Sequence, residues 1–371
     1  MALPSAPRPA PSPSRAVAGS LDDRPAGSVI EARPADRRPY SARHGRLAAG
    51  LIGLVLLLLA VSFLSIALGA RHVGLDVVFD VLRNQGTGDA EHQVVENRIP
   101  RLVAGLLVGA ALGLAGTIMQ AVARNPLADP GLFGVNAGAA FAVVCAIKIG
   151  ITAALGYVWF AMAGAAAVAV LVYVIGSFGG GATPVKVALA GAAMHAALTA
   201  LTTAVLLTDT TTFDQYRFWS VGSLAGRQWD LIGRLAPFLV VGIVVALGSG
   251  WILNTLALGD EVARGLGQRV GLARGAAAAT AVVLCAAATS LVGPLWFVGL
   301  VAPHVARIIT GPDQRWILAY SAVVAAILLV GADVVGRLIA RPGEVQVGVV
   351  MALVGAPVLV LLVRRARVAQ P

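Results

Sequence analysis

Charged residues are scarce in this sequence. Only 12% of the 371 residues are charged, whereas 58% are hydrophobic, and the mean hydropathy is +0.84. Soluble domains carry about 25% charged residues, and disordered chains are poor in hydrophobic residues, so the composition excludes both classes. It predicts a protein that crosses a membrane several times.

Lysine is scarcer still, because only Lys148 and Lys186 occur among the 28 basic residues. A phosphate-binding P-loop needs a lysine followed by serine or threonine. Here Ile149 and Val187 follow the two lysines. The chain therefore lacks a P-loop and cannot bind ATP by that route.

Cysteine is limited to Cys145 and Cys285, both within apolar runs. Neither has the spacing of a metal ligand set, and two isolated cysteines do not indicate a disulfide framework. We interpret them as small buried hydrophobic residues. No metal site, catalytic cluster or cofactor site is expected in this chain.

Long apolar runs dominate the rest of the sequence. A helix needs about 20 apolar residues to span a bilayer, and the run 275–310 is divided by Gly293-Pro294 into a full helix and a short one. The pattern predicts an all-α, polytopic membrane protein with ten transmembrane helices. The segments are 47–70, 102–123, 130–147, 152–176, 187–208, 235–259, the two parts of 275–310, 316–332 and 345–363.

The segments outside these runs divide the chain and orient it. Residues 1–46 hold eight of the 19 prolines and are predicted to form a disordered tail. Residues 47–365 are predicted to form a transmembrane domain, and residues 366–371 a C-terminal end. Ten spans place both termini on one side, and placing the tail inside puts 18 basic residues inside and 10 outside. The positive-inside rule therefore predicts cytoplasmic termini in a bacterial inner membrane. The net charge of +10 is then an orientation signal rather than a sign of nucleic-acid binding.

Small residues are frequent within the spans, as in residues 107–116. They let helix backbones approach closely in a membrane, so a tightly packed bundle is expected. Residues 124–134 and 293–303 are faintly similar and are separated by five predicted spans. An odd number of spans reverses the direction of the chain across the membrane, so the similarity predicts an inverted repeat.

Carboxylates are almost absent from the spans. Asp333 is the nearest case, and Arg337 follows it at the spacing that places both on one helix face. Ion-coupled transporters place titratable residues inside spans. No coupling site is evident, so the energy for transport must come from elsewhere.

Two charged features stand out beyond the spans. The loop 256–267 begins a short predicted helix with Asp260 and Glu261, which suit a helix N-terminus; it is either a plain connector or a docking surface for a soluble partner. Arg98, Arg101 and Arg337 are predicted at outer helix ends, against the charge rule. They either snorkel and serve helix-end chemistry or receive carboxylates of an external partner.

Several motifs in order resemble the FecCD-type permeases of binding-protein-dependent ABC importers, which take up iron-siderophores, haem and cobalamin. The resemblance covers residues 47–365. The motifs are Arg98-Ile-Pro-Arg101, Met119-Gln120, Arg124-Asn-Pro-Leu-Ala-Asp-Pro130, Gly222-Ser-Leu224, Leu258-Gly-Asp260, Gly293-Pro294, Phe297-Val-Gly-Leu300, Pro303-His304 and Asp333 with Arg337, Pro342 and Glu344.

The resemblance implies a type II ABC importer permease fold and roles for particular residues. The short helix in the loop would couple to an ATPase subunit, and the three outer arginines would meet glutamates of a binding protein. The fifth span and a short helix at about 215–224 would line the pathway, with 179–185 as a cytoplasmic gate. The coupling residues are Gly259, Asp260, Glu261, Ala263, Leu266 and Gly267, and the pathway and gate residues are Thr183, Trp219, Gly222 and Ser223.

These observations predict the permease subunit of an importer, with ferric siderophore as the expected substrate. The resemblance implies a second permease subunit, two ATPase subunits that bind ATP and Mg²⁺, and an extracytoplasmic binding protein. Membrane lipid is the other partner, and no nucleic acid is expected. The alternatives are a cobalamin or haem importer of the same family, an ion-coupled secondary transporter, and an exporter subunit or membrane enzyme.

Overall fold

The computed structural model describes residues 40–83, 85, 88–179 and 183–368. These residues form fourteen α-helices and one 3₁₀ helix and no strand. The packed helices belong to one unit, Gly45–Pro371, which alone is discussed below. Residues 1–39 of the predicted tail 1–46, and residues 369–371, lie outside the described residues. Residues 40–46, which were expected to be disordered, belong to the helix that begins at Tyr40.

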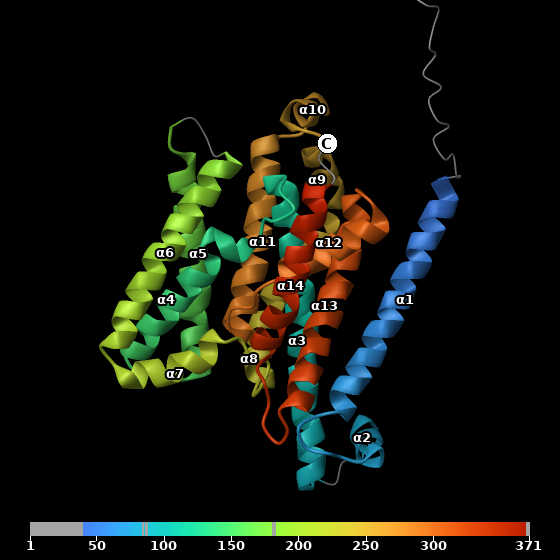
Figure 1. Cartoon of the computed structure of the whole chain (residues 1–371), viewed down its shortest axis with the longest axis vertical. Coiled ribbons are helices and arrows are strands. Elements are labelled where there is room, and N and C mark those ends of the chain that lie inside the picture. The colour runs from blue at the N-terminus through green and yellow to red at the C-terminus, as the bar shows by residue number, and fades with distance from the viewer. Residues whose placement is uncertain (1–39, 84, 86–87, 180–182, 369–371) are drawn as a thin grey trace, which may run out of the picture. The chain divides into compact units, whose positions relative to one another are not determined.

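The elements follow one another along the chain as Figure 1 shows. Their bounds are α1 Tyr40–Ala67, α2 Leu75–Leu82, α3 Ala90–Ala123, η1 Pro130–Phe133, α4 Val135–Lys148, α5 Ala154–Ser177, α6 Pro184–Leu207, α7 Thr210–Ser220, α8 Trp229–Gly248, α9 Gly250–Ala257, α10 Asp260–Gly265, α11 Val270–Val292, α12 Val298–Thr310, α13 Gln314–Ile339 and α14 Val347–Val368.

Seven of the described helices are long and apolar enough to cross a membrane: α1, α3, α5, α6, α8, α11 and α13. Three shorter apolar helices, α4, α12 and α14, complete the set. Each of the ten predicted segments overlaps one of these helices, so the all-α polytopic fold is confirmed. The predicted segment 235–259 is interrupted at Ser249 and includes α9 as well as α8, and the segment 130–147 begins with η1. The expected division at Gly293-Pro294 is also present, because α11 ends at Val292 and Gly293 has a φ of 86°.

The short helix predicted at about 215–224 lies earlier, at Thr210–Ser220 (α7). Asp209 caps its N-terminus, since its carboxylate accepts a hydrogen bond from the backbone N–H of Thr211 at 3.0 Å. The helix stops because Gly222 adopts a φ of 76°, outside the helical region. The prediction of a short helix was right in kind, but its boundaries were wrong by about one turn.

Helix α3 lies at the centre of the bundle and packs against α8, α11, α12 and α13. A stripe of glycines, Gly105, Gly109 and Gly113, faces α13, and Gly116 faces α12. A methyl group added at Gly109 would lie 2.6 Å from the Cα atom of Ala326, and one at Gly113 would lie 2.5 Å from the backbone oxygen of Ser321. The backbones therefore touch, as expected for small residues in membrane helices.

The two ends of α3 define the two ends of the bundle. Its N-terminal half contacts α2, and its C-cap residue Arg124 contacts α10. We call these the α2 end and the α10 end; they lie at the bottom and top of Figure 1. With 34 residues, α3 is about 50 Å long at 1.5 Å per residue. It exceeds the ~30 Å hydrocarbon core of a bilayer, so residues at both ends reach the membrane surfaces.

A second group of helices, α4, α5 and α6, packs together, and α5 contacts α11 of the central group. Lys148 at the end of α4 donates to Asp209 at the start of α7 over 3.1 Å. Hydrogen bonds from Thr212 and Lys148 lower the pKa of Asp209 to about 2. The carboxylate is thus ionised at neutral pH and links α4 to α7.

Candidate functional site

The predicted outer arginines come together at the α2 end. Asp333 of α13 accepts two hydrogen bonds from Arg101 of α3, through Nη2 at 2.7 Å and Nε at 3.0 Å. Arg337, one turn further along α13, approaches the same carboxylate at 3.1 Å. The expected placement of Asp333 and Arg337 on one helix face is confirmed, and the two side chains form an ion pair. The pairing of Asp333 with Arg101 was not predicted.

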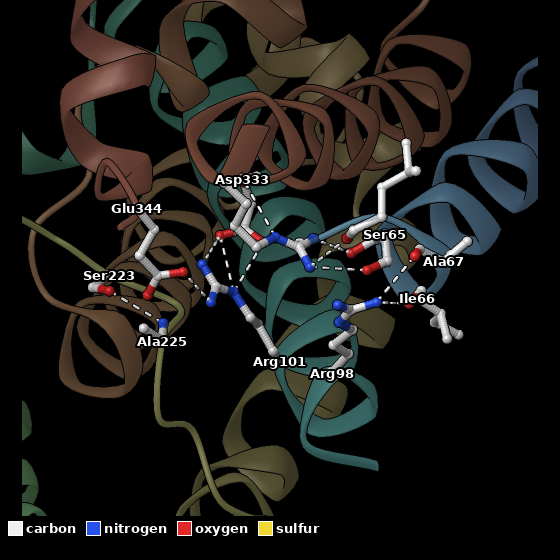
Figure 2. A network of polar contacts seen from close by, with 11 residues as sticks. Ser65, Ile66, Ala67, Arg98, Arg101, Ser223, Ala225, Asp333 and Glu344 are labelled. Carbon is white, nitrogen blue, oxygen red and sulfur yellow. Dashed lines mark hydrogen bonds and ion pairs between the residues drawn. The ribbon is translucent and has the colours of Figure 1, made fainter. Parts of the chain in front are cut away.

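Arg98 and Arg337 are buried and bind the C-terminal end of α1 (Figure 2 shows Arg98 beside it). Arg98 donates to the carbonyl oxygens of Ile66 at 2.7 Å and Arg71 at 2.8 Å. Arg337 donates to the backbone oxygen of Ser65 at 2.9 Å and to its hydroxyl at 2.7 Å. The last carbonyls of a helix lack partners within it, and α1 has no basic residue in its own last turn. Arginines from α3 and α13 supply both the donors and the positive charge that this end favours.

Helix-end chemistry, one of the two interpretations given above, is therefore what the structure shows for Arg98 and Arg337. Arg98 is 6% exposed and Arg337 is 3% exposed. Arg101 is the member nearest the surface: its Nη1 donates to the carboxylate of Glu344 at 2.7 Å, and the Glu344 side chain is one-third exposed. Figure 2 shows Arg101 between Asp333 and Glu344. The docking role of the three arginines stays a prediction.

The α10 end holds the predicted coupling helix. Asp260 and Glu261 begin α10 as expected, after Gly259 with a φ of 110°. Ala263 is buried against the bundle, whereas Leu266 is 59% exposed. Gly267, with a φ of 81°, follows the helix and leads the chain away.

One carboxylate fixes α10 to the bundle. Asp260 accepts a hydrogen bond from Arg274 of α11 at 2.9 Å and another from Arg124 at the end of α3. Burial acts to raise the pKa of Asp260, but Arg274 and Arg124 outweigh it and hold that pKa below its ordinary value. Asp260 is therefore ionised at neutral pH and remains paired with both arginines.

An exposed apolar stripe also lies at this end. Leu258, Val262 and Leu266 are 62%, 50% and 59% exposed. Val262 lies on α10, Leu258 precedes the helix, and Leu266 is its C-cap residue. The docking role of this loop stays a prediction. Sequence reasoning named Leu266 but missed Leu258 and Val262 as part of this surface, although their spacing was readable.

The predicted pathway residues lie at the junction of α7 with the loop before α8. Trp219 is buried, the N–H of Ser223 donates to the carbonyl of Val292 at 2.7 Å, and the carbonyl of Gly222 accepts from Gly348 at 3.1 Å. These contacts join the loop to the ends of α11 and α14. Thr183 is exposed and caps α6, while the rest of the predicted gate includes residues 180–182, which lie outside the described residues.

Comparison with known proteins identifies the family. The FecCD transport family matches residues 57–365. The ferric enterobactin transport system permease protein FepD of Escherichia coli is 44% identical over 84% of this chain and 94% of its own length. The Fe(3+)-citrate import system permease protein YfmD of Bacillus subtilis is 39% identical over 87% of this chain and 96% of its own.

A solved structure described as an inward-facing conformation of a metal-chelate type ABC transporter superposes with a TM-score of 0.75. It is 26% identical and covers 86% of this chain and 99% of its own. The chain belongs to the FecCD transport family. It is a multi-pass membrane protein with the fold of an ABC importer permease, as the sequence motifs indicated.

The arginine cluster generates a stability prediction. Asp333 is 2% exposed and is the countercharge of two arginines. Replacing it by asparagine leaves those guanidinium groups without their shared carboxylate, and breaking a buried ion pair destabilises by about 3–5 kcal/mol. We expect Asp333→Asn to lower the melting temperature of the detergent-solubilised chain markedly, measured by thermal unfolding.

The matched control is Asp230→Asn, because Asp230 is an exposed residue in the first turn of α8. Surface substitutions of this kind change stability by about 0.5 kcal/mol or less. If Asp333→Asn has the same melting temperature as Asp230→Asn and wild type, the arginine cluster around Asp333 does not stabilise the fold.

Proposed function

We propose that this chain is the permease subunit of an ABC importer that carries ferric siderophores across the bacterial plasma membrane. The family match over residues 57–365 carries the proposal. Relatives at 44% and 39% identity are permeases for ferric enterobactin and for Fe(3+)-citrate. Haem and cobalamin are the alternative cargoes, because relatives for hemin and for cobalamin also match.

The energy comes from separate ATPase subunits. Asp333, near the α2 end of α13, is held between Arg101 and Arg337. Carboxylates are otherwise scarce in the apolar spans, where an ion-coupled transporter would carry its titratable residues. The exposed apolar stripe Leu258, Val262 and Leu266 supports an ATPase contact, since exposed apolar patches mark protein interaction sites. In this proposal a second permease subunit completes the pathway.

The α10 end then faces the cytoplasm. Arg264, Arg269 and Arg274 lie in or beside α10 and the start of α11, and cytoplasmic segments are enriched in basic residues. The α2 end faces outward and receives the binding protein. There Arg101 meets an acidic group of that protein, which takes the place of Glu344 on the Arg101 guanidinium. Arg98 and Arg337 hold α1 and fix the position of Arg101.

Substrate and energy source are tested together by uptake in cells that lack their own siderophore permease. The chain is expressed with its cognate ATPase and binding protein, and the cells receive ⁵⁵Fe-labelled ferric enterobactin, ferric hydroxamate or ferric citrate, or labelled hemin or cobalamin. We expect accumulation of a ferric siderophore, abolished by an ATPase variant that cannot hydrolyse ATP. Uptake of hemin or cobalamin alone would overturn the substrate, and uptake without ATP hydrolysis would support an ion-coupled transporter.

The docking role of Arg101 is tested by the affinity of the binding protein for the chain in nanodiscs. A hydrogen bond to a charged group contributes about 1.5–3 kcal/mol, so Arg101→Ala should weaken binding about tenfold or more. Glu344→Gln should strengthen it, because the internal competitor for the guanidinium is removed. The control is Arg83→Ala, which removes an exposed arginine beside α2. Equal affinities for wild type and Arg101→Ala would contradict the role.

A further inference from the structure

Arg124 has a backbone conformation that its side-chain type does not favour. It is the C-cap residue of α3, with φ 49° and ψ 35°, in the left-handed region. Glycine is the usual residue at such a helix end. Among the described residues, Phe297 is the one other non-glycine residue with a positive φ. A strained arginine where glycine fits better points to a role for the side chain.

The side chain of Arg124 joins three helices. Its Nε and Nη2 donate to the carbonyl oxygen of Leu256, in the last turn of α9, at 3.2 and 3.0 Å. Its Nη2 also pairs with Asp260, the first residue of α10. One guanidinium group from α3 therefore holds the end of α9 and the start of α10 together.

Helix α10 has few other attachments. It is six residues long, and Ala263 is its buried residue. Arg274 of α11 shares the carboxylate of Asp260, and Gln268, which follows the helix, accepts a hydrogen bond from Thr255 of α9. A displacement of α10 therefore pulls on Arg124 and Arg274 through Asp260.

Helix α3, whose C-cap residue is Arg124, is continuous from the arginine cluster to the α10 end. Arg101 and Arg124 lie on α3 23 residues apart, or about 35 Å at 1.5 Å per residue. Pro100, the proline within α3, precedes this stretch. The stretch is buried and closely packed against α13 and α12 through its glycines. Close-packed elements transmit displacement instead of absorbing it.

We propose that Arg124 is a positioning residue that couples α10 to α3, so that events at α10 and at the arginine cluster of the α2 end are linked through one helix. This rests on the proposed function, in which α10 contacts an ATPase and the α2 end receives a binding protein. The joint is the pair Arg124–Asp260, reinforced by Arg274.

The test is ATP hydrolysis by the complete complex in nanodiscs, with and without the binding protein. Arg124→Gly removes the side chain and suits the left-handed conformation. We expect the variant to assemble with the ATPase and to keep its basal hydrolysis, but to show about tenfold less stimulation by the binding protein, within the usual range of coupling between sites. A purely structural role would lower basal and stimulated hydrolysis together.

Three further variants sharpen the result. Arg124→Asn should repeat the effect, since asparagine also tolerates the left-handed region, and it serves if Arg124→Gly does not fold. Adding Asp260→Ala to Arg124→Gly should reduce stimulation little further, because residues of one joint are not additive. Arg269→Ala removes an exposed charge beside α11 and should behave as wild type.

Full stimulation of both Arg124→Gly and Arg124→Asn would overturn the inference while leaving the importer assignment intact. A wild-type chain that binds no ATPase subunit would overturn the proposed function, and the inference with it. The two failures are therefore distinguishable.

Discussion

The structure depends on how closely α13 and α12 approach α3. Gly105, Gly109, Gly113 and Gly116 leave no side chain between the backbones, and in a membrane this contact replaces the hydrophobic drive that soluble helices have. Because α13 lies so near, Asp333 reaches Arg101 across the interface. The arginine cluster is thus a consequence of the packing.

Both ends of the molecule for which partner contacts are proposed are placed by α3. At the α2 end, Arg98 and Arg101 extend from it, and α1, whose middle is largely exposed, is held by Arg98 and Arg337. At the α10 end, Arg124 holds α9 and α10. A central, buried helix that carries charged residues at each end is well suited to link two partners on opposite sides of a membrane.

Much of the fold could be predicted from the sequence because apolar length and small-residue content are local properties. The ten segments, the break at Gly293-Pro294 and the Asp333–Arg337 pair follow from spacing alone. The pairs Arg101–Glu344 and Arg124–Asp260 join residues more than 130 positions apart, which no spacing rule reaches. The burial of Arg98 could not be foreseen, because its partners are backbone carbonyls of α1.

The central claim, that α3 connects the two ends through Arg124, is tested most directly by hydrogen–deuterium exchange of residues 256–267 in the assembled complex. The account predicts that adding the binding protein at the α2 end changes exchange in this segment in wild type and leaves it unchanged in Arg124→Gly. The same change in both proteins, or no change in wild type, would contradict it. Exchange measures the free energy of local opening, so the comparison shows directly whether binding at the α2 end changes the stability of residues 256–267.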